Sequence, residues 1–475
     1  MNKQGTVKRI QKKYVFRLIC GIIIMLLMTA TFAFVWIRYA TTHNTTGHLE
    51  GTGNIAMALF IYLGLSVIVT RWMGGFKIGV NRKLNVVASQ ILSALVVDFL
   101  EVFISLAILG QFRYFWPIFW RYLLLFAVQS VLLAAFTIPA INLYRKVIKP
   151  FHMIEVYGKK ADLENSLYEK LNSLPYKFQV EKKVLCPDDI SVLTDEFAKY
   201  DAVVLNDLED EQQNSLIKLC FAINKRVYYV PKISDIIISS ADTMNLFDTP
   251  LDLNRNNGIS IFRLAVKRLL DILISLIALI ILSPGFLIVA LCIKLEDKGP
   301  VFYRQDRVTL NGKVFKIIKF RSMIVDAEKD GRSHPAGQKD DRITKIGRVI
   351  RAIRFDELPQ LINVLKGDMS IVGPRPERVE HVELYAKQIP EFHFREKVRG
   401  GLTGYAQVFG KYNTSALDKL KMDVIYITNY SLTMDLQILF ETVKILLKKD
   451  STEGFTEKAQ EKVMQGKGMQ KVPIK

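Results

Sequence analysis

Two adjacent carboxylates, Asp356 and Glu357, stand in a part of the sequence that is otherwise rich in arginine and lysine. In "DELPQLINVLKG" apolar residues recur at helical spacing, Pro359 fits a first turn and Gly367 fits a helix end. The acids would then cap a short helix and offset its dipole, which stabilises a helix by about 1 kcal/mol. Alternatively, a carboxylate among phosphate-binding arginines can bind Mg²⁺ or attack phosphorus as a nucleophile. The neighbouring "GPRP", whose prolines stiffen a loop that presents Arg375, favours the chemical interpretation.

Two basic segments upstream of the acids could supply phosphate contacts. "GKVFKIIKFRSM" alternates basic and apolar residues as a strand does, so it would direct Lys316 or Lys319, together with Arg321, at an anion. In "DDRITKIGRVIRAIR" the isoleucines form a narrow helical stripe, and Arg351 lies on the opposite side. A basic amphipathic helix is typical of a membrane surface, and arginine binds phosphate bidentately. The pattern therefore favours a lipid that bears a phosphate.

Composition supports a membrane protein. Half of the 475 residues are hydrophobic, and the net charge is +19. A basic excess beside long apolar segments indicates an anionic membrane surface rather than nucleic acid as the partner. The four cysteines show no CxxC spacing, so neither a disulfide framework nor a zinc site is expected, and the compartment is predicted to be reducing.

Residues 1–149 are predicted to form a four-helix transmembrane unit. Each apolar segment approaches or exceeds the ~20 residues that cross a bilayer. The first is too long for the core of a cleaved signal peptide. Lysine and arginine flank the unit at both ends but are absent from 39–53, which places both ends of the unit in the cytoplasm. The apolar segments are 16–37, 54–70, 84–110 and 114–143.

Two acids, Asp98 and Glu101, lie three residues apart inside the third apolar segment, on one helical face. Acids inside a membrane segment are functional candidates. A role in helix packing or at the membrane interface is an equal alternative, because the segment is long enough for both to lie near one end. The sequence leaves their role open.

Residues 150–255 alternate between strand-like and helical stretches, which is typical of a parallel sheet with crossover helices. The strand-like stretches include "HMIEVY", "YDAVVLN" and "RVYYVP". The loop after the first has one glycine, whereas a dinucleotide-binding fingerprint needs G-x-G-x-x-G. We therefore expect a degenerate Rossmann-like domain with a structural or regulatory role.

A further apolar stretch, residues 269–293, is long enough to span a membrane but contains Pro284. A proline there kinks or breaks a helix near Ser283, and the ~14 residues before it rise only ~21 Å against a ~30 Å core. Both flanks are basic, which favours the cytoplasm for both. We expect a re-entrant helix over 267–294; the alternative is a proline-kinked fifth span.

From about residue 267 to 449 the sequence resembles the bacterial sugar transferase family, the polyprenyl-phosphate phosphoglycosyl transferases that prime surface-polysaccharide synthesis. The upstream parts resemble the larger members, which initiate capsule or exopolysaccharide synthesis. The resemblance implies a membrane α plus α/β protein with a monotopic catalytic domain over 256–450. The composition of residues 451–475 predicts a mobile basic tail after it. The matching stretches are "KRLLDILISL", "SPGFL", "GPVFYRQDRV", "FKIIKFRSM", "RITKIGRVIR", "DELPQLINVLKGDMSIVGPRPE", "GLTGYAQV" and "DVIYITNYSLTMDLQILFETV".

The resemblance implies transfer of a sugar 1-phosphate from a UDP-sugar to undecaprenyl phosphate, with release of UMP. Asp356 would be the nucleophile that forms an aspartyl-phosphosugar and would bind part of the Mg²⁺ shell, and Glu357 would assist. Arg351 would bind the lipid phosphate. The nucleotide sugar would contact Lys319, Arg321 and Arg375, and the re-entrant helix would break at Ser283 and Pro284.

The resemblance also implies the bacterial inner membrane, with membrane lipids as partners and a cytoplasmic catalytic domain. It allows a homo-oligomer and contacts with other polysaccharide-assembly proteins. The sugar stays open, although UDP-glucose or UDP-galactose is favoured. Where the family often has Thr-Ser-Leu before the acids, this chain has residues 353–355 as "IRF", which puts only local packing in doubt. The alternatives are a glycosyltransferase that moves only the sugar and a non-catalytic membrane scaffold.

Overall fold

The computed structural model describes residues 3–42, 52–109, 112–159, 167–254, 260–325, 340–410 and 414–446. The chain forms two compact units, Met1–Val230 and Pro231–Lys475. The tail predicted over 451–475 lies outside the described residues, as does most of the loop after the first predicted strand.

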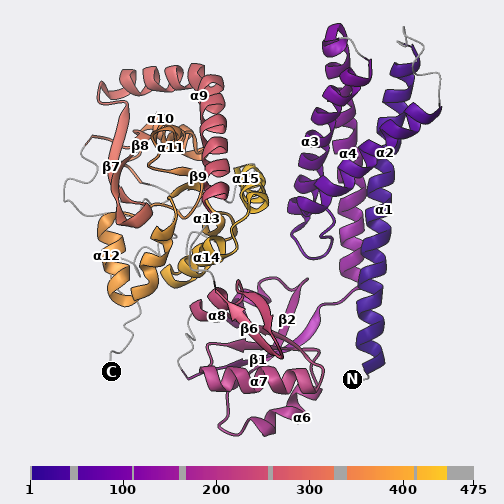
Figure 1. Cartoon of the computed structure of the whole chain (residues 1–475), viewed down its shortest axis with the longest axis vertical. Coiled ribbons are helices and arrows are strands. Elements are labelled where there is room, and N and C mark those ends of the chain that lie inside the picture. The colour runs from indigo at the N-terminus through magenta and orange to yellow at the C-terminus, as the bar shows by residue number, and fades with distance from the viewer. Residues whose placement is uncertain are drawn as a thin grey trace. The chain divides into compact units, whose positions relative to one another are not determined.

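Four long helices form the start of the first unit, and they agree with the predicted helical N-terminal region (Figure 1). Each contains a stretch that is long and apolar enough to cross a membrane. Large apolar side chains such as Phe60 and Trp116 stay exposed on their outer surfaces, which suits contact with lipid. The helices are α1 (Lys3–Thr42), α2 (Thr52–Trp72), α3 (Lys83–Leu109) and α4 (Phe115–Val147), with the turn η1 (Phe112–Tyr114) before α4.

Asp98 and Glu101 on α3 face the interior of this unit, where they are 3% and 1% exposed. The Tyr62 hydroxyl of α2 donates to Asp98 Oδ1 at 2.9 Å, and Gln129 Nε2 of α4 donates to Tyr62 Oη at 2.9 Å. Asp98 thus takes part in a polar contact that joins three helices.

A four-stranded parallel sheet completes the first unit, with the strand order β2-β1-β3-β4. Residues of β1 are apolar on both faces, because one face packs with Phe197 and the other with Val180. The structure contains the three predicted strands and adds β2. The elements are β1 (Phe151–Tyr157), α5 (Leu167–Asn172), β2 (Phe178–Leu185), η2 (Ile190–Val192), α6 (Leu193–Ala198), β3 (Ala202–Asn206), α7 (Asp210–Ala222) and β4 (Arg226–Tyr229).

The second unit holds the acid pair among short helices and three two-stranded pairings, of which β7 with β8 and β5 with β6 are antiparallel and β9 with β10 is parallel. Its elements are α8 (Ile233–Ile238), β5 (Asp242–Leu246), β6 (Thr249–Leu253), α9 (Ile261–Asp297), β7 (Phe302–Val308), η3 (Leu310–Gly312), β8 (Val314–Phe320), α10 (Lys345–Ala352), η4 (Phe355–Glu357), α11 (Gln360–Lys366), β9 (Ser370–Val372), α12 (Val379–Gln388), η5 (Pro390–Lys397), β10 (Gly401–Thr403), α13 (Tyr405–Phe409), α14 (Ala416–Thr428) and α15 (Leu432–Leu446).

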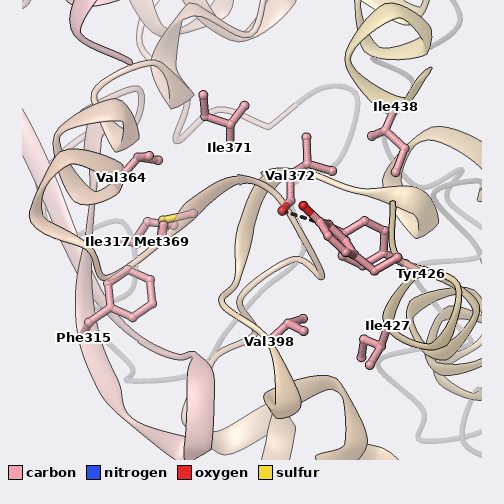
Figure 2. Packing of buried hydrophobic residues seen from close by; sticks show 11 residues of the cluster. Phe315, Ile317, Val364, Met369, Ile371, Val372, Val398, Tyr426, Ile427 and Ile438 are labelled. Atoms are coloured by element: carbon pink, nitrogen blue, oxygen red, sulfur yellow. Dashed lines mark hydrogen bonds between the residues drawn. The ribbon is translucent and has the colours of Figure 1, made fainter. Parts of the chain in front are cut away.

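The core of this unit joins strand β8 to helices α11 and α14 (Figure 2). The Tyr426 hydroxyl donates to the Val372 carbonyl at 3.1 Å and so links α14 to β9. A second cluster packs Ile236 of α8 against Leu420 and Val424 of α14. Because of this packing, α8 belongs to the second unit, and the division at 230/231 differs from the border predicted at 255/256.

Helix α9 is anchored to the protein near Lys267 and Arg268 and carries an outward apolar surface. Lys267 Nζ lies 2.7 Å from Asp435 Oδ2, and the guanidinium of Arg268 donates to the last carbonyls of α11 at 2.6 and 2.9 Å. Farther along, Ile281 and Leu287 are 70% and 73% exposed. The helix continues through Pro284 and does not end at Ser283, but it bends sharply along its course (Figure 1).

Candidate active site

The acid pair lies in a tight turn that follows α10. Thr344 caps α10, because its Oγ1 accepts from Gly347 N at 2.9 Å. A Cβ at Gly347 would lie 2.0 Å from the Ser322 carbonyl oxygen, so the glycine that weakens the helix is required for its packing. After the helix, Arg354 adopts a left-handed conformation with φ 57°, which turns the chain into η4.

Neither acid caps the following helix in the described structure, because η4 is a turn of its own and α11 starts only at Gln360. The predicted helix is present, but the acids precede it. Instead, Glu357 Oε1 accepts from Lys319 Nζ at 3.0 Å and from Arg375 Nη2 at 2.7 Å. The strand β8 and the "GPRP" loop therefore converge on one carboxylate.

Glu357 is ionised in this setting. Burial by itself would raise the pKa of its carboxyl, but Arg375 and Lys319 outweigh burial and hold the pKa well below the ordinary value. In return, Glu357 raises the pKa of Arg375. Burial lowers the pKa of Lys319 even though Glu357 lies beside it. Glu357 therefore acts as the fixed anion that holds two cations at the site.

Asp356 is in a different state. It is partly buried, and no described residue is within hydrogen-bond or ion-pair distance of its carboxylate. Burial raises the pKa of Asp356, and the charge of Glu357 adds to this effect. The charges of Lys319 and Arg351 act in the opposite direction. The charge of ionised Glu357 is thus balanced by Lys319 and Arg375, whereas the Asp356 carboxylate is open to a ligand.

The predicted phosphate-binding residues divide into two groups. Lys319 and Arg375 both bind the Glu357 carboxylate. Arg351, at the end of α10, acts on Asp356 instead, because its positive charge lowers the pKa of that carboxyl. Arg321 points elsewhere: its guanidinium pairs with Asp297 at the end of α9 and packs against Gly299. In this structure Arg321 joins α9 to the strand.

Two arginines outside the predicted set, Arg395 and Arg307, support the "GPRP" loop. Arg395 Nη2 donates to the Arg375 carbonyl at 2.9 Å and lies 2.9 Å from Asp423 Oδ2. Arg307 Nη1 donates to the Pro376 carbonyl at 3.2 Å, and burial followed by the charge of Arg375 lowers the pKa of Arg307 to about 10. Their partners lie far away in the sequence, so spacing gave no signal.

The site can bind a phosphate-bearing ligand and present a carboxylate to it. Among the described residues no group of three or more His, Cys, Asp or Glu side chains gathers to hold a metal ion. The open Asp356 carboxylate fits a Mg²⁺ ion that takes one protein ligand and completes its shell with substrate phosphates and water. The donor set is therefore compatible with Mg²⁺ but provides no cage without substrate.

The long apolar helix α9 indicates a protein that associates with a membrane. The acids and basic side chains beside it form a site that suits the binding of a phosphate group. A family model described as Bacterial sugar transferase matches residues 262–449. The chain is 42% identical over 188 residues to "Exopolysaccharide production protein PSS" of Rhizobium leguminosarum bv. phaseoli, which covers 38% of this chain and 94% of the relative. The chain belongs to the bacterial sugar transferase family.

Two further relatives carry names that state a reaction. The chain is 38% identical over 275 residues to "UDP-N-acetylgalactosamine-undecaprenyl-phosphate N-acetylgalactosaminephosphotransferase" of Aeromonas hydrophila, covering 56% of this chain and 63% of the relative. It is 41% identical over 230 residues to "UDP-glucose:undecaprenyl-phosphate glucose-1-phosphate transferase" of Klebsiella pneumoniae, covering 46% of this chain and 48% of the relative. The chain thus spans roughly half to two thirds of these longer relatives.

Proposed function

We propose that the protein transfers a sugar 1-phosphate from a UDP-sugar to undecaprenyl phosphate and releases UMP, as the priming step of capsular or exopolysaccharide synthesis. The observation that carries this proposal is the division of labour in the acid pair. Glu357 holds Lys319 and Arg375 together, while the carboxylate of Asp356 beside them is left without a protein partner. The names of the relatives support the reaction class.

In the proposed first step the Asp356 carboxylate attacks the β-phosphorus of the UDP-sugar. A bond forms between Asp356 oxygen and phosphorus, and the bond to the bridging oxygen breaks, so that UMP leaves with the electron pair. In the second step an oxygen of the lipid phosphate attacks the same phosphorus, which gives a lipid diphosphosugar and frees Asp356. Glu357 has a low pKa, so its proposed role is to position the two cations rather than to accept a proton.

Lys319 and Arg375 are proposed to bind the diphosphate of the UDP-sugar, since their charges converge within reach of Asp356. Asp356 would hold Mg²⁺ together with the substrate. When it is bound, Mg²⁺ neutralises charge that develops on the diphosphate.

The membrane arrangement is part of the proposal. Helix α9 is proposed to be re-entrant, so that it enters and leaves the cytoplasmic leaflet, with the site at headgroup level on the cytoplasmic side of the inner membrane. Its bend, its exposed apolar residues and its basic flanks support this. The four-stranded parallel sheet of the first unit is proposed to be a degenerate Rossmann-like domain without a working cofactor site.

The released nucleotide tests the reaction. Membranes that contain the protein, undecaprenyl phosphate and a panel of UDP-sugars are expected to form UMP in equal amount to the lipid product. A glycosyltransferase that moves only the sugar would release UDP, and a scaffold would release neither. Formation of UDP without UMP would contradict the proposal.

Arg351→Ala is expected to raise the apparent KM for the lipid more than the KM for the UDP-sugar. The loss of a charged phosphate contact costs about 2 kcal/mol, which is roughly 30-fold in binding. Initial-rate assays with each substrate varied would measure both constants. Arg348→Ala removes an exposed arginine from the same helix and should change both by less than about threefold. Equal increases in both KM values for Arg351→Ala would exclude a specific lipid role.

Cysteine labelling tests the re-entrant helix. Ser260→Cys and Lys298→Cys, placed singly at the two ends of α9 in a background without native cysteines, are both expected to react from the cytoplasmic side. Replacing Ser283 and Pro284 by leucine should give a mixture of re-entrant and membrane-spanning α9. A straight helix of the 25 apolar residues 269–293 rises about 37 Å and can span the membrane, whereas the basic residues on both sides still favour the cytoplasm. If unmodified α9 leaves position 298 reachable only from outside, α9 is a fifth span.

A further inference from the structure

Three phenylalanine rings from three elements meet beside the acid pair. Phe286 of α9, Phe320 at the end of β8 and Phe355 of η4 have centroids 5.2 to 6.1 Å apart. Phe286 meets the other two nearly edge-on, at 82° and 77°, and these geometries are favourable for aromatic pairs. These three residues are called the phenylalanine triad below.

Helix α9 makes room for this contact with a glycine. A Cβ at Gly285 would lie 3.1 Å from Phe355 Cζ, which is closer than most Cβ atoms come to a neighbour. Gly285 directly follows Pro284, so the ring of Phe355 rests against the part of α9 that contains the proline. A movement of this part of α9 would therefore displace the ring of Phe355.

The next residue after Phe355 is Asp356. No described side chain holds the Asp356 carboxylate, so its position depends on the backbone of η4. The Glu357 carboxylate, by contrast, is held by Lys319 and Arg375. On the other side of Asp356, Phe355 packs against Phe286 and Phe320. The two neighbours of Asp356 are thus both anchored, one by charge and one by packing.

We propose that Phe355 is a positioning residue for Asp356, and that its seat against Gly285 couples the bend of α9 to the placement of the nucleophile. This inference rests on the proposed function. It assigns a task to the aromatic residue before the acids and gives the membrane helix a direct mechanical link to the reacting group.

Paired substitutions test the coupling. Gly285→Val should displace the Phe355 ring and lower kcat by about 10-fold to 100-fold, since a displacement near 1 Å can cost 10²-fold. Phe355→Leu should lower kcat by about threefold to 10-fold, which is less than the loss in Gly285→Val. The double variant should be faster than Gly285→Val alone, because the smaller side chain leaves space for valine. KM values for both substrates should stay within about threefold in all variants.

Two further measurements separate positioning from general stability. Phe302→Leu removes a ring that stacks on Phe320 at 5.4 Å, and among the described residues Phe302 and Phe355 form no ring pair. This control should retain kcat within about twofold. Hydrogen exchange of the backbone amides of 354–358 should accelerate in Gly285→Val and Phe355→Leu, return toward the wild-type rate in the double variant and stay unchanged in Phe302→Leu.

The outcomes are distinguishable. If the wild-type protein releases UMP but the Gly285 and Phe355 variants combine additively, the positioning role is wrong and the proposed function stands. The same holds if KM rises as kcat falls, or if Phe302→Leu matches Phe355→Leu. If the wild-type protein releases no UMP from any UDP-sugar, the proposed function fails, and the positioning role fails with it. Rescue in the double variant, in both kcat and exchange, supports the coupling.

Discussion

Asp356→Asn is expected to reduce UMP release by more than about 10³-fold while the protein stays folded and bound to membranes. The amide keeps the shape of the side chain but loses the charge that attacks phosphorus and binds Mg²⁺. No described side chain bonds to the carboxylate, so the substitution breaks no contact that the structure shows. The measurement is UMP release at saturating UDP-sugar and lipid, normalised to the amount of protein in the membrane fraction.

Thermal unfolding of Asp356→Asn shows whether a loss of activity comes from unfolding. Burial raises the pKa of Asp356 above its value in the unfolded chain, so folding disfavours the ionised form at neutral pH. A neutral asparagine should therefore leave the midpoint of thermal unfolding unchanged or raise it. Glu383→Gln, which neutralises an exposed acid on α12, should retain full activity. Near-normal UMP release by Asp356→Asn would remove Asp356 from the mechanism.

The acidity of Asp356 also sets a pH dependence. The nucleophile must be ionised, and its pKa is raised by burial and by Glu357. The rate of the first step should therefore rise with pH through a pKa that lies above the ordinary value of an aspartate.

The sequence predicted the long elements well because their signals are local. The four apolar helices and the strand that carries Lys319 follow from hydropathy and alternation alone. The choice between Lys316 and Lys319 was open, since both fit an alternating strand. The structure separates them, because Lys319 is within bonding distance of Glu357 and Lys316 is not among the partners of Glu357 that the structure describes.

The sequence could not predict contacts whose two partners lie far apart in the chain. Arg321 was expected at the substrate, but its partner is Asp297 at the end of α9. A glycine such as Gly347 ordinarily weakens a helix, and the approach of the Ser322 carbonyl explains why a side chain does not fit there. The acids were expected at the start of α11, yet they lie in the separate turn η4, and α11 begins only at Gln360. In each case tertiary packing decided what spacing left open.

Glu357→Gln is expected to lower the free energy of unfolding by about 3 kcal/mol, which corresponds to a fall of roughly 6–12 °C in the unfolding midpoint of a unit this size. The substitution leaves Lys319 and Arg375 beside each other without their shared anion. Arg375 is 38% exposed, so solvent screens part of the effect and keeps it at the lower end for a buried pair. Thermal unfolding in nanodiscs, with Glu383→Gln as the matched control, measures the difference.

The difference in stability between the wild type and Glu357→Gln should depend on pH. The pKa of Glu357 is lower in the folded protein than in the unfolded chain, where it is about 4.3. Its stabilisation is therefore complete above that value and is lost as the pH falls through the folded-state pKa. The gap between wild type and Glu357→Gln should be constant from neutral pH down to about pH 5 and should shrink in stronger acid. A gap that is already closed at neutral pH would show that Glu357 does not hold the two cations. With the gap open at neutral pH, the two adjacent acids give opposite results. Asp356→Asn loses activity without losing stability, whereas Glu357→Gln loses stability because its charge holds Lys319 and Arg375 in the site.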